Sequence, residues 1–373
     1  MTVLGAGTNQ SGTEEPLVFL LALRSTPGVG DRTVAHLLKA LTHPERAWHS
    51  TGTEWRSITG RARPRGVGRP AGLREARALL ERCEASGIQV VGSRLPGYPD
   101  RLLHLYDPPP ILFLKGRSEL AHTEGLAVVG TRRASAPGRR FAESLGREAS
   151  QAGIPVLSGL ALGIDAAAHR GALEGSGGTV AVLGTGVDRV HPPSHRRLQE
   201  AVVAGGGLLV SEFLPDETAR SHHFPRRNRI LAALARAVVV VEAGRRSGAL
   251  ITADHALDLG KDVYAVPGPV EWEQCRGTNA LLQEGATLLT RPGEVLETWG
   301  PGCRVQAPAA GPVNPGVDDP LGILELLAAR PLPTDLVAEH LDAPVPQVLA
   351  GLSELELDGW VARSADGWHR VKP

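Results

Sequence analysis

The sequence predicts an α/β protein with a doubly wound sheet domain, an all-α domain before it and a winged helix after it. The central part alternates short apolar strands with glycine-rich turns and helix-like stretches, which is typical of parallel strands joined by crossover helices. Apolar residues in the N-terminal part have helical spacing, and the C-terminal end reads as three helices and two short strands. The expected boundaries are residues 1–15 for a disordered tail, 16–84 for the helical domain, 85–300 for the sheet domain, 301–319 for a linker and 320–373 for the winged helix.

Four places where an apolar strand runs into a turn support the prediction of a sheet domain in the centre of the chain. The apolar segments 127–129, 155–157, 180–183 and 238–241 each run into a turn rich in Gly, Ser, Thr or Arg. Ligands of doubly wound sheets bind in the crevice outside the carboxyl ends of the strands. Glycine lets backbone amides approach a ligand, a helix N-terminus favours negative charge, and arginine offers a forked donor. The pattern therefore predicts a Rossmann-like domain with a phosphate-binding edge.

The helical domain contains two features that suit nucleic acid, each with an alternative. Pro27-Gly28-Val29-Gly30 lies before a new helix from Asp31, which resembles the helix-hairpin-helix element, in a SAM-like or similar domain. An ordinary αα-hairpin with a glycine turn is the alternative. Residues 61–82 carry seven arginines, which form either a basic patch or a solvated linker and helix.

The C-terminal segment has the helix and strand order of a winged helix. Helices are expected at 320–329, 334–341 and 345–356, followed by two strands around residues 365–367. Residues 318–373 contain ten acidic and four basic residues, a net charge of −6, and the third helix has no Lys or Arg. Because attraction to phosphate dominates DNA affinity, we expect this module to contact protein rather than to bind duplex DNA strongly.

Composition narrows the function classes. The formal net charge is zero, and 36 of the 40 basic residues are arginine, which reflects codon usage or a preference for phosphate. The three cysteines form no C-x-x-C pair, so neither a disulfide framework nor a metal site is expected, and a reducing cytoplasm fits best. The apolar run 16–23 is too short to cross a bilayer, and the N-terminus lacks a basic leader region.

Enzyme motifs for nucleotide cofactors are not matched. The first parallel strand ends in Gly130-Thr131-Arg132, without the second glycine of a G-x-G-x-x-G fingerprint. Gly184-Thr185-Gly186 is followed by Val187, Asp188 and Arg189, and no G-K-[ST] occurs. We therefore expect no cofactor, no hydride transfer and no NTP hydrolysis.

Two turns of the sheet domain are candidate anion cradles. Gly130-Thr131-Arg132, with Gly138 opening the next helix, offers amides, a hydroxyl and a guanidinium, although Arg132 could simply face solvent. Residues 158–165 form a second turn that begins with Ser158-Gly159. Within the following helix, Asp165 and His169 have i, i+4 spacing, which suits metal ligation or acid–base chemistry. A local hydrogen bond or a helix-start role is favoured, because no third ligand is evident.

Residues 221–229 combine cations with an aromatic ring. Phe224 precedes Arg226, Arg227, Asn228 and Arg229, just before an apolar helix. Phosphate contacts plus a ring for base stacking are what a single-strand binder requires. The alternative is a charged helix N-terminus with the Phe224 ring packed into the core.

These motifs occur in one order along about 170 residues of the chain. They are Tyr98-Pro99, the segments 109–116, 128–132 and 158–169, Ser211-Glu212, and the segments 224–229, 247–253 and 266–268. The set resembles the DNA-processing protein A (DprA/Smf) family. A helical domain before the sheet domain and a winged helix after it are similar to the longer members.

The resemblance implies a recombination mediator without enzymatic activity. Such a protein would bind single-stranded DNA through the sheet domain, form a homodimer through it and load RecA, with single-strand-binding protein as a further candidate partner. It implies that Arg132 holds a phosphate, that residues 226–229 line the DNA groove and that Phe224 lies in or beside a base pocket. With the turns above, the expected DNA-binding residues are Gly130, Thr131, Arg132, Ser158, Gly159, Phe224, Arg226, Arg227, Asn228, Arg229, Ser247 and Gly248.

Two other functions remain as alternatives. A nucleotide phosphoribohydrolase of the lysine-decarboxylase-like type would have a related fold, but residues 246–253 lack the carboxylate of its P-G-G-x-G-T-x-x-E motif. A winged-helix transcriptional regulator is the second alternative, and the acidic charge of residues 318–373 argues against it.

Overall fold

The computed structural model describes residues 11–299, 322–327, 332–341, 343–364 and 367–371. The chain divides into two compact units between Gln306 and Ala307. The predicted linker, residues 301–319, and the first ten residues of the predicted tail lie outside the described residues. The fold class expected from the sequence, a doubly wound α/β sheet with a helical domain and a winged helix, is confirmed.

Five helices form the N-terminal helical domain. They are α1 (Ser11–Ser25), α2 (Asp31–Leu41), α3 (Pro44–His49), α4 (Gly52–Thr59) and α5 (Pro70–Ala85). Helix α1 begins at Ser11, so residues 11–15 are helical rather than part of a disordered tail. A capping box between Thr51 and Glu54 starts α4. Trp48 and Trp55 are fully buried, and the core of this domain continues into the first two strands of the sheet.

The sheet has nine strands in the order β1-β2-β6-β5-β4-β3-β7-β8-β9. They are β1 (Ile88–Gly92), β2 (Ile111–Gly116), β3 (Gly125–Val129), β4 (Val156–Ser158), β5 (Thr179–Val182), β6 (Leu208–Ser211), β7 (Ala235–Val240), β8 (Asp262–Ala265) and β9 (Thr287–Leu288). The β1–β2 and β2–β6 pairs are antiparallel, and all other pairs are parallel. From β3 the chain builds outward to β6 on one side and then crosses to β7 on the other, so the switch point lies between β3 and β7.

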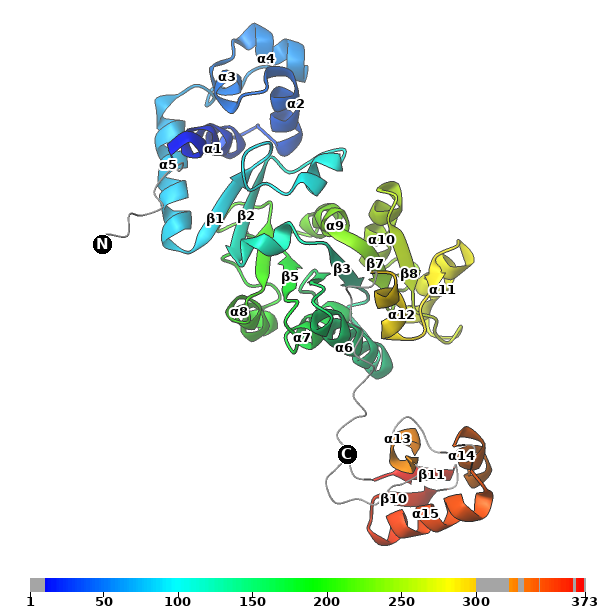
Figure 1. Cartoon of the computed structure of the whole chain (residues 1–373). Coiled ribbons are helices and arrows are strands. Elements are labelled where there is room, and N and C mark those ends of the chain that lie inside the picture. The colour runs from blue at the N-terminus through cyan, green and yellow to red at the C-terminus, as the bar shows by residue number, and fades with distance from the viewer. Residues whose placement is uncertain (1–10, 300–321, 328–331, 342, 365–366, 372–373) are drawn as a thin grey trace, which may run out of the picture. The chain divides into compact units, whose positions relative to one another are not determined.

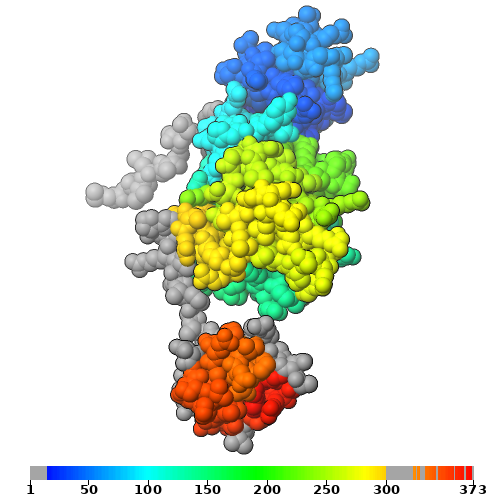
Figure 2. All heavy atoms as spheres, turned by 90° about the vertical axis from the view of Figure 1, so that its right-hand side faces the viewer, coloured from blue at the N-terminus to red at the C-terminus, as the bar shows by residue number. Residues whose placement is uncertain are grey.

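Helices cover both faces of the sheet (Figure 1). They are α6 (Ala136–Gln151), α7 (Ile164–Ala172), α8 (Arg196–Ala204), α9 (His223–Leu234), α10 (Gly248–Asp258), α11 (Arg276–Gln283) and α12 (Pro292–Glu297), with 3-10 turns at Asp100–His104, Ser118–Ala121, Pro193–His195 and Glu273–Cys275. Alternate residues of β3 separate the layers: Val128 belongs to the core with α6 and α7, and Val129 to the core with α9 and α10. Figure 2 shows the end of the sheet domain that carries α11, in yellow.

The second unit contains the elements of the winged helix. They are α13 (Ile323–Leu327), α14 (Thr334–His340), α15 (Val345–Leu357) and the antiparallel strands β10 (Val361–Ser364) and β11 (Gly367–Arg370). Val337, Val348 and Leu352 are fully buried between them. None of the helices in the described ranges of either unit is long and apolar enough to cross a membrane.

Candidate nucleic-acid interface

A pocket lies where β3 and β7 end, at the switch point of the sheet, as expected for a ligand site in this class of fold. Its wall is made from the loops after β3 and β7, the turn before α7, and the first turns of α9 and α10. Five arginines line it, against the two carboxylates of Asp165 and Glu273. The arginines are Arg132, Arg133, Arg227, Arg245 and Arg246.

Arg227 is the buried cation of this pocket. It is 4% exposed, and its Nε and Nη1 have no hydrogen-bond partner among the residues that the structure describes. Its guanidinium lies against the α-carbon of Gly159, where an added methyl group would come within 2.2 Å of Nη2. Burial lowers the pKa of Arg227 to about 10, and the Asp165 carboxylate opposes that shift, so the guanidinium stays charged at neutral pH. A buried cation with unpaired donors in a pocket is suited to an anionic ligand.

Phe224 places an aromatic ring in the same pocket. The guanidinium of Arg132 lies 5.0 Å from the centre of this ring, and the His191 ring lies 5.3 Å from it. Arg132 is exposed and Phe224 is only partly buried. The predicted alternative, a Phe224 ring packed into the core, therefore does not describe this side chain. The pair offers a ring for stacking next to an exposed cation.

The two predicted anion cradles are already filled by carboxylates of the protein. Glu242 accepts a hydrogen bond from the Ser135 amide (2.9 Å) and one from its hydroxyl, at the N-terminus of α6. Asp165 Oδ2 accepts from the amides of Gly159 (3.0 Å) and Ala161 (3.3 Å). These turns therefore shape the pocket, and some of their donors are already used by carboxylates of the protein. Asp165 thus has the local hydrogen-bonding role that the lack of a third ligand in the sequence favoured.

Several other predicted residues serve the fold around these turns. Gly130 has no room for a side chain, because a methyl group there would lie 2.5 Å from Ile164 Cγ1. The Thr131 amide donates to Glu242 O at 2.7 Å. Ser158 is fully buried, and its hydroxyl donates to Val128 O at 2.6 Å, so it lies behind the pocket rather than in its lining. His169 Nδ1 contacts Thr179 Oγ1 at 2.7 Å, and burial lowers the pKa of His169 to about 3.

A further turn at the pocket connects β7 to α10. The first helical turn of α10 contains no acidic residue. Ser247 caps the helix, and Gly248 O accepts a hydrogen bond of 3.0 Å from Asn228 Nδ2. Arg245 and Arg246 precede the cap and are exposed. The helix N-terminus and these cations together provide the most favourable place in the pocket for a phosphate. The sequence prediction named Ser247 and Gly248 here but not the two arginines, although they stand in the same turn after the strand.

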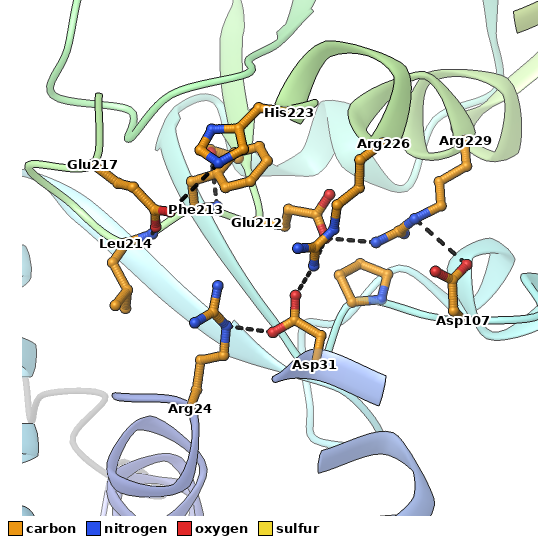
Figure 3. A network of polar contacts seen from close by, with 12 residues as sticks. Arg24, Asp31, Asp107, Glu212, Phe213, Leu214, Glu217, His223, Arg226 and Arg229 are labelled. Carbon is orange, nitrogen blue, oxygen red and sulfur yellow. Dashed lines mark hydrogen bonds and ion pairs between the residues drawn. The ribbon is translucent and has the colours of Figure 1, made fainter. Parts of the chain in front are cut away.

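Arg226 and Arg229 do not reach the pocket, although the sequence placed them in the DNA groove. Arg226 Nη2 and Arg229 Nη2 both donate to Glu212 Oε2, at 2.8 and 2.5 Å. Arg226 also pairs with Asp31, the first residue of α2, and Arg229 Nε lies 3.5 Å from Asp107 (Figure 3). Asp31 in turn pairs with Arg24 of α1. Three cations and three carboxylates balance in this internal network, which joins the helical domain to α9.

The geometry defines a class of protein: a Rossmann-like domain with a basic, ring-bearing pocket at the switch point of its sheet, followed by a winged helix. The comparisons with known proteins place the chain more narrowly. It belongs to the DNA recombination-mediator protein A family, whose family model matches residues 84–300, and the model of the DprA winged helix domain matches residues 307–367. The family expected from the motifs is thereby confirmed.

Relatives with known sequences and structures agree with this placement. The chain is 41% identical to Protein Smf of Escherichia coli over 285 residues, which cover 74% of this chain and 75% of that protein. It is similar to the crystal structure of DprA from Streptococcus pneumoniae, with a TM-score of 0.61 and 33% identity over 75% of this chain and 95% of that one. A structure of DprA from Helicobacter pylori, described in terms of its single-stranded DNA binding mode, has a TM-score of 0.51 and 28% identity over 57% of this chain and 95% of that one.

Proposed function

We propose that this protein is a recombination mediator that holds single-stranded DNA in the pocket at the ends of β3 and β7. The observation that carries the proposal is the partly exposed Phe224 ring, which lies beside Arg132 and lines the same pocket as the cationic start of α10. Stacking of a base on an aromatic ring contributes about 1–3 kcal/mol and tolerates any base, while arginines track the backbone. The single-stranded DNA binding of the Helicobacter pylori relative supports the same ligand.

Within this proposal the predicted residues take different roles. Arg132 and Arg227 contact phosphates, together with Ser247 before α10, Gly248 at its start and the two arginines that the sequence prediction did not name, Arg245 and Arg246. Phe224 stacks on a base, and Asn228 holds the start of α10 through Gly248 O. Gly130, Thr131 and Gly159 allow close approach of the backbone or of Arg227. Ser158, Arg226 and Arg229 have no direct role with the strand, because their side chains are bound inside the protein.

We propose a binding role rather than a catalytic one. The buried carboxylates beside the pocket, Asp165 and Glu242, already accept hydrogen bonds from backbone amides of the protein. A general base needs a carboxylate that can reach the substrate. Asp165 and Glu242 are held at turns of the fold, and Glu273, the other carboxylate of the pocket lining, pairs with Arg276 at 2.9 Å. This arrangement and the missing glutamate in residues 246–253 argue against the phosphoribohydrolase alternative.

The test of strand binding is Phe224→Ala. We expect affinity for single-stranded oligonucleotides to fall by about 1–3 kcal/mol, the value of one stacked base, as measured by fluorescence anisotropy. Tyr106→Ala is the matched control, because Tyr106 is an aromatic residue that is 90% exposed and does not line the pocket. Equal affinity of the Phe224 variant and wild type would remove the pocket from the proposal.

Loading of RecA and assembly as a homodimer are finer proposals that rest on the family. We expect the protein to speed filament formation by RecA on strands coated with single-strand-binding protein. The measurement is the lag before ATP hydrolysis by RecA, with Phe224→Ala as the variant that cannot hold the strand. A lag that is equally long with and without the wild-type protein would contradict loading.

A further inference from the structure

The helical domain carries a concentration of positive charge that the pocket does not use. Residues 16–84 contain twelve Lys or Arg and six Asp or Glu, a net charge of +6. Residues 85–300 contain 23 basic and 22 acidic residues, a net charge of +1. The positive charge of the chain is thus gathered in its N-terminal helices, although the formal charge of the whole chain is zero.

Part of this charge is exposed and lies in one short stretch of the chain, residues 56–65. Arg56 on α4 and the neighbouring Arg61 and Arg65 are exposed, and none of the three forms an ion pair within the described residues 11–299. Figures 1 and 2 show the N-terminal helices, in blue, protruding from one end of the sheet domain. We call Arg56, Arg61 and Arg65 the α4 surface.

A hollow beside this surface is lined by donors and lacks carboxylates. Its lining consists of Gly52, Thr53, Arg56, Ser57, Ala62 and Arg63. Arg63 Nη2 donates to Trp48 O at 3.0 Å, while its buried Nε has no hydrogen-bond partner. Two hydroxyls and two guanidinium groups in one hollow are suited to phosphate oxygens.

The glycine turn between α1 and α2 lies against residues 64–66, which follow α4 in the chain. A methyl group on Gly66 would collide with Thr26 Cγ2 at 2.8 Å, and one on Gly28 would lie 3.9 Å from Pro64 Cγ. Gly28 has a φ of +85°, and Gly30 precedes α2 without a side-chain cap. This turn therefore lies next to Arg65. From the sequence it could be either a DNA-binding hairpin or an ordinary αα-hairpin.

The surface has no means of reading bases. The aromatic residues of this domain, Phe19, Trp48 and Trp55, are each at most 6% exposed. Single-strand binding without sequence preference combines cations with exposed rings, as in the pocket. A surface with cations alone is suited to the phosphates of a duplex, whose bases are already stacked and whose charges lie at a regular spacing.

We propose that the α4 surface and the adjoining hollow form a second DNA-binding site, which holds the backbone of double-stranded DNA without regard to sequence. The pocket takes the unpaired strand, and the α4 surface takes duplex. This proposal does not depend on the pocket, because its ligand and its residues are different.

The experiment compares two triple variants of the full chain. One is Arg56→Gln, Arg61→Gln and Arg65→Gln. The control is Arg140→Gln, Arg170→Gln and Arg197→Gln, which removes three exposed arginines from α6, α7 and α8. Binding of a blunt duplex and of a short single strand is measured over a range of salt concentrations. Thermal unfolding shows that each variant is folded.

For the α4-surface variant we expect weaker duplex binding and a salt dependence of log K flatter by about 0.9 for each phosphate that is no longer neutralised. Binding of the short single strand stays within twofold of wild type, and the control variant behaves as wild type with both probes. No duplex binding by wild type, an unchanged duplex slope in the α4-surface variant, or an equal loss in the control would overturn the proposal. Loss of single-strand binding in Phe224→Ala bears on the proposed function alone.

Discussion

The two faces of helix α9 carry similar residues and have opposite environments. One face points Phe224, Arg227 and Asn228 into the pocket. The other face directs Arg226 and Arg229 onto Glu212, inside the protein (Figure 3). On the first face Arg227 forms no ion pair within the described residues, whereas on the second Arg226 and Arg229 share the Glu212 carboxylate. A basic run therefore supplies binding residues only on the side of its helix that lines the pocket, and supplies structural residues on the side that meets carboxylates of the protein.

The charged network has a structural consequence for the pocket. Because Arg226 contacts both Asp31 of the helical domain and Glu212 of the sheet domain, it fixes α9 between the two. Residues 224, 227 and 228 lie on the same helix, one to two positions away, so their orientation depends on that anchorage. The internal face thus positions the binding face.

The largest expected effect comes from removing the centre of the network. Glu212→Ala leaves Arg226 and Arg229 without their shared carboxylate, and loss of one partner of a buried pair costs about 3–5 kcal/mol in the free energy of unfolding. Denaturant unfolding of wild type and variant at one and the same pH measures it. Glu217→Ala is the control, since that carboxylate is more exposed and forms no ion pair with Lys or Arg within the described residues. A loss below about 1 kcal/mol would contradict the structural role of the internal face.

The next smaller effect is a change in the salt dependence of single-strand binding, which differs between substitutions at the pocket and substitutions in the charged network. Arg132→Ala should flatten the salt dependence of single-strand binding by about 0.7, the value of one phosphate contact, and leave unfolding nearly unchanged because Arg132 is exposed. Arg226→Ala should lower the free energy of unfolding, while the salt dependence of single-strand binding by the folded protein stays as in wild type. Binding isotherms at several salt concentrations measure this dependence for both variants. A flatter slope for Arg226→Ala would place that side chain on the strand.

The smallest expected effect is on pH dependence. Burial raises the pKa of Glu212 to about 7 from an ordinary value of 4.5, Asp107 raises it further, and Arg229 and Arg24 oppose the shift. Since the folded carboxyl binds a proton more readily than the unfolded one, this contribution to stability is complete below 4.5 and is lost as pH rises through 7. The stability difference between wild type and Glu212→Gln should therefore shrink across this window in urea unfolding. A difference that grows with pH would show that the two bound arginines dominate over burial.

Much of the fold could be predicted because its signals are local. The apolar segments at 127–129 and 238–241 each end in a glycine turn, and β3 and β7 lie there with the pocket at their ends. The motif order identified the family, which the family model confirms over residues 84–300. The boundary of the tail was wrong at residues 11–15, since a helix start with few apolar residues gives little periodic signal.

By itself, the sequence determined the doubly wound sheet, the edge at which a ligand lies, and the ring and cations available there, because strand length, glycine turns and residue type are properties of short segments. Only the tertiary structure decided which turns stay open and which arginines face the pocket. Glu242 fills the α6 turn from 107 residues away, and Arg226 meets Asp31 across two domains. Such long-range carboxylates neutralise a cation or occupy an amide cradle without leaving any pattern in the neighbouring sequence, so their effect appears only when the chain is folded.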